Sequence, residues 1–211
     1  MQTTAAEQVY AHLLSRILHN ELKPGDWVER KQLAEGMKTS LMPIAEAVQR
    51  LTLEGFLVSV PRRGTQVRVP GAEDVRGQIL VREALECQAA RLYCGAPVQA
   101  ARSRLQRLAK TADAPSGKST AWKAELAFHS ALVELADCAA LLENYMRVMN
   151  LVLFQQSALL TPYSFNRGDS HVQLIEDLGR LDVDAAEARM RKHIRTGKEQ
   201  ILQPTPRAKK N

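Results

Sequence analysis

The sequence predicts an all-α protein with a small β-wing, made of an N-terminal winged helix-turn-helix and a C-terminal antiparallel helical bundle. Two observations predict this. Apolar residues recur at three-and-four spacing through most of the 211 residues, and the strand signal is confined to residues 56–69. The break Pro70-Gly71-Ala72 separates the two patterns. We therefore expect a DNA-binding-type domain at 1–70, a helical domain at 73–202 and a flexible tail at 203–211.

The composition is that of a globular protein and sets few limits on its partners. The chain is 45% hydrophobic and carries a net charge of +6. Residues 1–70 hold 9 Lys/Arg against 7 Asp/Glu, so the charge alone does not establish a nucleic-acid partner. Three cysteines without a CxxC pair indicate reduced, mostly buried thiols. Neither a signal peptide nor an apolar run of membrane-spanning length is evident, so we expect a cytoplasmic protein without membrane contact.

Three short helices are expected in the first domain. The first covers residues 5–20 and the second residues 30–37, each with apolar residues at helical spacing. Ser40 is a suitable N-cap for the third, and Pro43 falls in its first turn, where a missing N–H costs little. Gly55 stands in the usual position just after a helix.

A two-stranded wing is expected to follow these helices. Residues 56–60 and 65–69 have strand character, and Pro61-Arg62-Arg63-Gly64 forms the turn between them. In a winged helix-turn-helix, one helix enters the major groove while cations of the wing lie by phosphates or in the minor groove. The alternative is a generic three-helix domain whose hairpin ends in a solvated turn.

This part of the chain resembles the DNA-binding domain of GntR-family bacterial transcription regulators. The resemblance rests on residues 29–35 (ERKQLAE), 43–51 (PIAEAVQRL) and 54–58 (EGFLV), with the Arg63-Gly64 wing tip. It implies binding to a double-stranded DNA operator. The family usually places arginines where this chain has Leu41 and Ala45, and arginine is the usual bidentate reader of guanine. We therefore expect altered or weakened operator recognition.

Several polar side chains remain as candidate DNA contacts. We expect three arginines mainly to contact phosphates, and Gln49 or Ser40 to reach a base. The full candidate set is Arg30, Thr39, Ser40, Gln49, Arg50, Arg62, Arg63 and Gly64, of which Arg30, Arg50 and Arg63 are the phosphate contacts.

The second domain is expected to be a bundle of about six helices. They cover residues 74–95, 97–111, 120–135 and 139–160, then a helix capped by Asp169 or Ser170, and a last one from Asp182 or Asp184 to about residue 202. Residues 161–168 are expected to form a loop. The interior of such a bundle can hold a ligand or a metal on facing helices.

A candidate metal site starts from Glu125 and His129. Residues four apart lie on one face of a helix, so the carboxylate and imidazole point the same way. Each of two further histidines, His171 and His193, lies in its own helical pattern, and the four side chains could close around one divalent ion. The alternative is that each histidine is an ordinary hydrogen-bonded side chain.

The helical part resembles the FCD effector domain of the FadR-like branch of the same family. The matching pieces are residues 82–86 (REALE), Phe128-His129 with Glu125 before it, His171, and residues 186–193. In that family an Asp and three His bind a divalent ion, and a small carboxylate effector often completes its coordination. The resemblance thus implies a zinc, nickel or manganese site, although Glu125 stands where Asp is more usual. Arg82 is the expected effector partner through its bidentate fork, and an ion pair with Glu86 is its alternative role.

These observations favour a homodimeric, ligand-responsive transcription regulator with no catalytic residues. A second class is a metal-dependent helical enzyme, because a carboxylate and three histidines with an open position can serve catalysis. A third is a helical adaptor that has lost specific DNA binding. This class remains because Leu41 and Ala45 stand where DNA-contacting arginines are usual.

Overall fold

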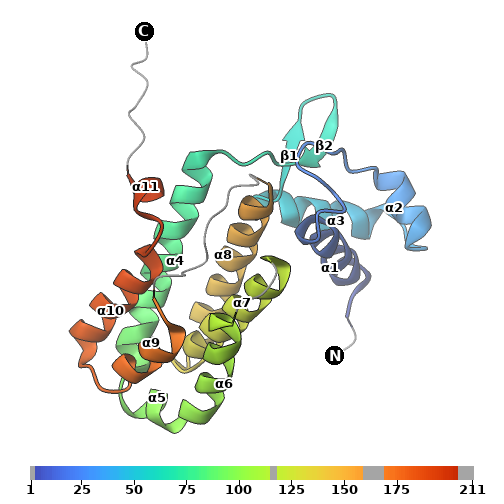
Figure 1. Ribbon diagram of the computed structural model, residues 1–211. Coiled ribbons are helices and arrows are strands. Elements are labelled where there is room, and N and C mark those ends of the chain that lie inside the picture. The colour runs from blue at the N-terminus through green and yellow to red at the C-terminus, as the bar shows by residue number, and fades with distance from the viewer. Residues whose placement is uncertain (1–2, 115–117, 159–168, 204–211) are drawn as a thin grey trace. The chain divides into compact units, whose positions relative to one another are not determined.

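A computed structural model describes residues 3–114, 118–158 and 169–203 (Figure 1). These residues fall into two compact units. The first holds the residues up to Gly71, together with the end of helix α8 (Ala139–Ala158) from Leu153 onward, and the second holds the remainder. The protein is mostly helical, with one two-stranded antiparallel sheet among the described residues, so the predicted fold class is confirmed.

Three helices build the core of the first unit: α1 (Ala5–Leu18), α2 (Arg30–Gly36) and α3 (Leu41–Leu53). Helix α1 begins with a capping box, in which Thr4 and Glu7 satisfy each other's backbone N–H groups. Ser40 is the N-cap of α3 as expected, although its side chain makes no capping hydrogen bond. The apolar faces of α1 and α3 pack together and bury Val9, Leu13, Ile17, Ile44, Ala47, Val48 and Leu51.

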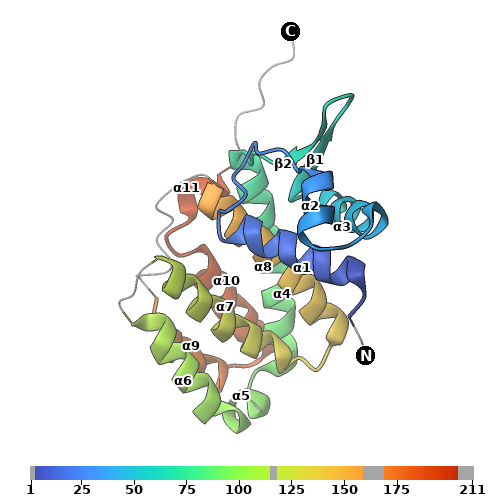
Figure 2. The same ribbon diagram turned by 90° about the vertical axis from the view of Figure 1, so that its right-hand side faces the viewer.

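The wing consists of β1 (Leu57–Val60) and β2 (Gly64–Val67), seen as a hairpin in Figures 1 and 2. The strands pair antiparallel from Leu57 opposite Val67 to Val60 opposite Gly64. The turn places Arg62 at φ 62° and Gly64 at φ 119°. Gly64 therefore occupies a left-handed conformation that a side chain would strain. Trp27 adds an isolated bridge to Gln66 and packs beneath Gly64.

The second unit is a helical bundle that begins with α4 (Ala72–Tyr93). Helix α4 packs along α10 (Val183–Arg195), and α6 (Arg102–Asp113) contacts both α7 (Lys118–Glu134) and α9 (His171–Leu178). Two short helices complete this part of the chain: α5 (Ala96–Ala100) and α11 (Glu199–Leu202). Figure 2 shows α6, α7 and α9 grouped at one end of the bundle.

Two of the expected helices are broken. The helix expected at 97–111 is divided at Ala101, and α6 runs on to Asp113. The last expected helix stops at Arg195, because Gly197 turns the chain with φ 74°, and α11 is a separate turn of helix.

Of the cysteines only Cys87 is buried, whereas Cys138 is exposed, so the expectation of mostly buried thiols was wrong. The expected loop 161–168 and residues 204–211 of the tail lie outside the described residues.

Among the described residues, no helix combines the length and apolar character required to cross a membrane.

Candidate functional site

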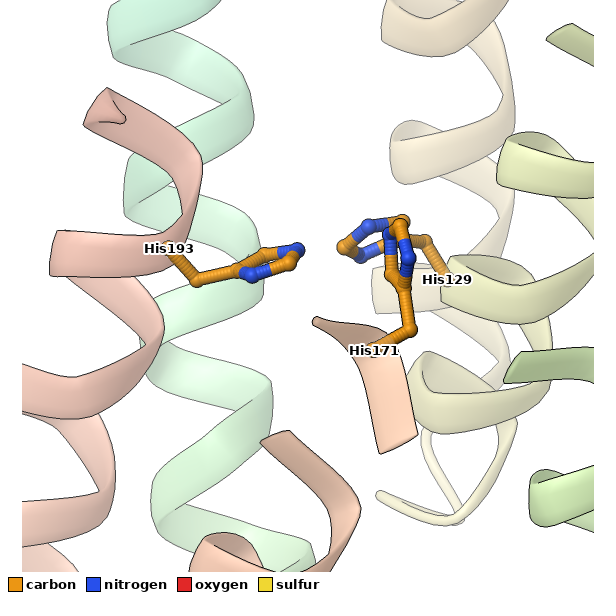
Figure 3. Close-up of side chains that lie close together, drawn as sticks. All are labelled: His129, His171 and His193. Atoms are coloured by element: carbon orange, nitrogen blue, oxygen red, sulfur yellow. The ribbon is translucent and has the colours of Figure 1, made fainter. Parts of the chain in front are cut away.

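Three histidines from three helices meet inside the second unit. His129 lies on α7, His171 is the first residue of α9, and His193 lies near the end of α10. Each is at most 3% exposed, and one ring nitrogen from each lies within 4.8 Å of the others. Figure 3 shows the His193 ring pointing across the bundle toward the rings of His129 and His171. The sequence predicted these three residues together, and the fold brings them together.

Each imidazole is oriented by a carboxylate at its Nδ1 atom. Nδ1 of His129 lies 2.6 Å from Glu86 Oε2 on α4. Nδ1 of His171 lies 2.6 Å from Oδ1 of Asp113, and Nδ1 of His193 lies 2.8 Å from Oδ2 of Asp169. A carboxylate can only accept, so Nδ1 carries the proton in all three rings and Nε2 is the nitrogen that remains for a metal. Carboxylates in this position orient histidine ligands and raise their basicity.

The two outer carboxylates are themselves held in place. Asp113, the last residue of α6, also accepts backbone N–H groups of His171 and Val172, so it caps the start of α9. Asp169 accepts both terminal nitrogens of Arg189 at 2.7 and 2.9 Å, and Arg189 Nε donates to Asp177. The orientation of His171 is therefore tied to the end of α6, and that of His193 to Arg189 on its own helix.

Glu125 lies beside two of the three histidines. Its Oε1 is 3.3 Å from Nε2 of His129, and its Oε2 is 3.1 Å from Nε2 of His171. The group of ligand atoms within 4.8 Å of one another contains the three histidines without Glu125, so its carboxylate is placed on one side of the cluster.

The residues present fit a divalent metal ion. The Nε2 atoms of His129 and His171 are buried and make no hydrogen bond with the described residues. When Nδ1 is protonated, Nε2 presents a lone pair to an oxygen of Glu125, and this arrangement is favourable only with a proton or a cation between the two atoms. Their separations match those of two ligands on one ion with bonds of about 2.0–2.2 Å. Imidazole and carboxylate together suit zinc, nickel or manganese.

The pKa values describe how the cluster is charged without an ion. Burial disfavours the charge on Glu125, but His129 and His171 outweigh it and hold the pKa of this carboxyl well below its usual range. Burial likewise opposes protonation of His129, yet Glu86 and Glu125 raise the pKa of its imidazole. Burial dominates at His193 and lowers its pKa to about 4. A proton on His129 thus occupies the place that a metal would take.

Arg82 forms the ion pair that the sequence offered as its alternative role. Its Nε donates to Oε1 of Glu86 at 2.5 Å, so the ion pair is present. Its terminal nitrogens make no hydrogen bond with the described residues, and Nη2 lies 3.7 Å from Oε1 of Glu125. Arg82 is 3% exposed. Its outer edge therefore keeps N–H donors beside the proposed metal ligands.

The candidate DNA contacts lie in the first unit, and some of them already have partners within the protein. Arg30, at the start of α2, donates to the Thr65 hydroxyl on β2 at 2.9 Å. Arg50 pairs with Glu54 at 3.0 Å and stacks on the Tyr10 ring. The remaining candidates are exposed except for Thr39, which is half-buried. The exposed ones are Ser40, Gln49, Arg62, Arg63 and Gly64.

The start of α3 exposes apolar side chains. Leu41 is 54% exposed and Met42 is 68% exposed, whereas Ala45 is half-buried. The wing tip carries a cation supported by an aromatic ring, because the Arg63 guanidinium lies 5.2 Å from the centre of the Trp27 ring. Trp27 gave no sequence signal of this role.

Sequence reasoning missed the carboxylates that orient the histidines. Glu86 was considered only as the partner of Arg82, Asp113 only as part of a loop, and Asp169 only as a helix cap. Lys198, a buried lysine near the same cluster, was also missed. The one available signal was the spacing of four between Arg82 and Glu86, since the other partners come from distant helices.

Comparisons with known proteins agree with both halves of the chain. Residues 5–67 match the family model "Bacterial regulatory proteins, gntR family", and residues 79–196 match "FCD domain". The chain is 26% identical over 203 residues to "HTH-type transcriptional repressor RspR" of Escherichia coli, covering 93% of this chain and 89% of that protein. It is also 26% identical over 200 residues to a "Probable D-xylose utilization operon transcriptional repressor" of Paenarthrobacter nicotinovorans, covering 92% and 87%.

Solved structures share the fold. A GntR-type putative regulator from Rhodococcus sp. RHA1 superposes with a TM-score of 0.71 at 21% identity, covering 95% of this chain and 98% of that chain. Escherichia coli McbR/YncC superposes with a TM-score of 0.60 at 20% identity, covering 95% and 94%.

Proposed function

Because the chain belongs to the GntR family of bacterial regulatory proteins and carries an FCD domain, we propose that its helical unit senses a small carboxylate through a bound divalent metal ion. The protein is a DNA-binding transcription regulator with an effector-sensing C-terminal domain, as its relatives are. The metal, its ligands and the class of effector are the proposal. As a regulator that acts on DNA, it would work in the cytoplasm.

One observation carries the metal part of the proposal. Three buried imidazoles each have Nδ1 on a carboxylate, and two Nε2 atoms face Glu125 without a hydrogen bond. His129, His171, His193 and Glu125 would hold the ion. When bound, the ion supplies a Lewis-acidic position at which a carboxylate oxygen can bind. Ordinary hydrogen-bonded histidines would not need their Nε2 atoms to meet at one point. The alternative in which each histidine is only a hydrogen-bonded side chain is therefore less favoured.

Arg82 supports the carboxylate part of the proposal. Its guanidinium is held in place by Glu86, which is in turn hydrogen-bonded to His129. The terminal N–H groups that remain suit a carboxylate, since charge-assisted bidentate pairs are the strong form of this contact. An effector bound there would be linked through Arg82 and Glu86 to the metal ligand His129.

For the first unit we propose that the exposed residues of α3 and the wing contact an operator. Arg30, Arg50 and Arg63 would contact mainly phosphates, with Arg62 and Gly64 beside them at the wing tip. Ser40 and Gln49 would approach base edges, and Thr39 would support the start of α3. We also propose a homodimer on a palindromic site, in which the effector changes the spacing of two winged helices.

The first experiment measures binding of the purified protein to DNA flanking its own gene, with competitor DNA and a salt series. Specific binding at moderate salt that changes when metal and carboxylates are added would support the proposal. Binding that is sequence-blind and lost at modest salt would favour the adaptor alternative. Linkage also requires that DNA change the affinity for the effector by the same factor, so equal effector affinity with and without operator would contradict the coupling.

Metal analysis tests the site itself. Protein purified without chelator should contain about one divalent ion per chain, and His193→Ala should lose it while the fold is retained. Light scattering of the same preparations measures whether the protein is a dimer. Retention of metal in a folded His129→Ala, His193→Ala double variant would refute the assignment of these ligands.

A further inference from the structure

Lys198 is a buried cation without a carboxylate of its own. It lies between α10 and α11 and is 6% exposed. Its Nζ donates one hydrogen bond, to the carbonyl of Ile194 at 2.8 Å. Among the residues that the structure describes, no carboxylate oxygen lies within 4.0 Å of this ammonium group, which has three N–H donors. Lysine is almost never buried without a partner, because the desolvation of its charge is costly.

The ammonium group lies near the proposed ligands, because its acceptor Ile194 directly follows His193 and α11 packs on α4, the helix of Arg82 and Glu86. Burial, followed by the positive charge of Arg82, lowers the pKa of Lys198 to about 8, while Glu125 and Glu86 act in the opposite direction. The amine is therefore still mostly protonated near neutral pH. N–H donors remain on both buried cations, since the terminal nitrogens of Arg82 also make no hydrogen bond with the described residues.

Tyr145 is a further buried donor in the helical unit. Its hydroxyl is buried and makes no hydrogen bond with the described residues. Burial, followed by the negative charge of Glu86, raises the pKa of this phenol well above its usual range, while Arg82 acts in the opposite direction. Donors without acceptors on two cations and a phenol are the complement of an anionic ligand that brings several acceptor oxygens.

The sum of the buried charges indicates how negative this ligand is. Glu83 is also buried, and Arg195 compensates its charge by donating to both of its oxygens at 2.7 and 2.9 Å. Arg82 and Lys198 carry two positive charges, and Glu86 and Glu125 carry two negative ones, so these four groups are neutral together. A divalent ion at the histidines adds two positive charges. Buried charge is tolerated when it is compensated, and a ligand with two negative groups compensates it fully, whereas a monocarboxylate leaves one positive charge.

We propose that the effector is a small organic dicarboxylate, with one carboxylate at the metal and Arg82 and the second at Lys198. This inference rests on the proposed metal and carboxylate site and adds a second anionic subsite to it. In this proposal Lys198 provides the preference for dicarboxylates over monocarboxylates, whereas Arg82 and the metal would bind the carboxylate that both kinds of acid share.

Calorimetry on the metal-loaded full-length protein tests the proposal with matched pairs of acids. Succinate is compared with butyrate and glutarate with valerate, so that each pair differs by one carboxylate. We expect the better dicarboxylate to bind at least tenfold more tightly than its monocarboxylate partner. Lys198→Met should lower the affinity for that dicarboxylate at least tenfold and change that for the monocarboxylate less than twofold. Lys198→Arg should keep the preference, and Lys192→Met, an exposed lysine on α10, is the matched control.

The outcomes separate this inference from the proposed function. If mono- and dicarboxylates bind equally and both need the metal, the sensor stands and the role of Lys198 is refuted. A dicarboxylate preference that survives Lys198→Met in a folded protein refutes that role as well. Absence of binding by every carboxylate, or binding of inorganic phosphate alone, overturns both. Circular dichroism of each variant shows whether the fold is intact.

Discussion

Oε2 of Glu86 accepts a hydrogen bond from Nδ1 of His129 at 2.6 Å, although the two residues lie 43 positions apart on α4 and α7. The other oxygen of Glu86 is held by Arg82. Burial raises the pKa of a carboxyl, but Arg82 and then His129 outweigh it here and lower the pKa of Glu86 to about 2. One ionised carboxylate therefore orients a proposed metal ligand and neutralises the proposed effector contact.

We expect Glu86→Gln to weaken metal binding about 10- to 100-fold, the usual effect of losing a carboxylate behind a histidine ligand. The amide cannot hold the Nδ1 proton as strongly, and it leaves Arg82 without its counter-ion. Competition with a chromophoric chelator measures the affinity. Glu73→Gln, an exposed carboxylate on the same helix, should leave it unchanged. Equal affinities in the two variants would contradict the role of Glu86.

The helices could largely be predicted from the sequence, because an amphipathic pattern such as Val9, Leu13 and Ile17 is local. The break at Ala101 could not, since alanine does not mark a helix end, whereas Gly197 is a helix-ending residue whose signal was overlooked. The three histidines were found through one spacing of four and a family resemblance. Their carboxylates were missed because Asp113 and Asp169 reach them only through tertiary packing. A buried lysine is equally invisible, because nothing near Lys198 in the sequence indicates burial.

Metal affinity should fall as the pH is lowered. The pKa of His129 is raised by Glu86 and Glu125 against the effect of burial, so its Nε2 atom holds a proton to a higher pH than a free imidazole does. Metal binding must displace that proton. Affinity should therefore decline as the pH falls through the raised pKa of His129, starting above the ordinary histidine range near 6.5. Chelator competition between pH 5 and 9 would show this, and a constant affinity would contradict a histidine-bound ion.

Leu13→Ala should destabilise the winged domain by about 2–5 kcal/mol, because this side chain is fully buried between α1 and α3. Leu53→Ala removes the same atoms from a residue that is 82% exposed and should change the free energy of unfolding by less than about 0.5 kcal/mol. Urea unfolding of both variants provides the comparison. A similar loss of unfolding free energy in both variants would mean that the Leu53 side chain is buried in solution.

Arg63→Ala should weaken binding to all DNA sequences alike. The Arg63 guanidinium lies over the Trp27 ring at the exposed wing tip, a position suited to a phosphate. Removing one phosphate contact should reduce the slope of log affinity against log salt by about 1. Fluorescence anisotropy over a salt series measures it, with Arg180→Ala in the helical unit as the control. An unchanged slope would remove Arg63 from the interface.

Leu41→Arg should increase affinity for guanine-containing operator variants. Leu41 is 54% exposed at the first position of α3, where arginine is usual in this family, and an apolar side chain there can contact a thymine methyl but cannot bond to guanine. A selection of bound sequences from random DNA should give the native protein a site without guanine at the base facing residue 41. The variant should gain guanine there, with about 1–3 kcal/mol of discrimination. If both proteins select the same sequences, Leu41 does not face a base, and the altered recognition would have to come from Ala45.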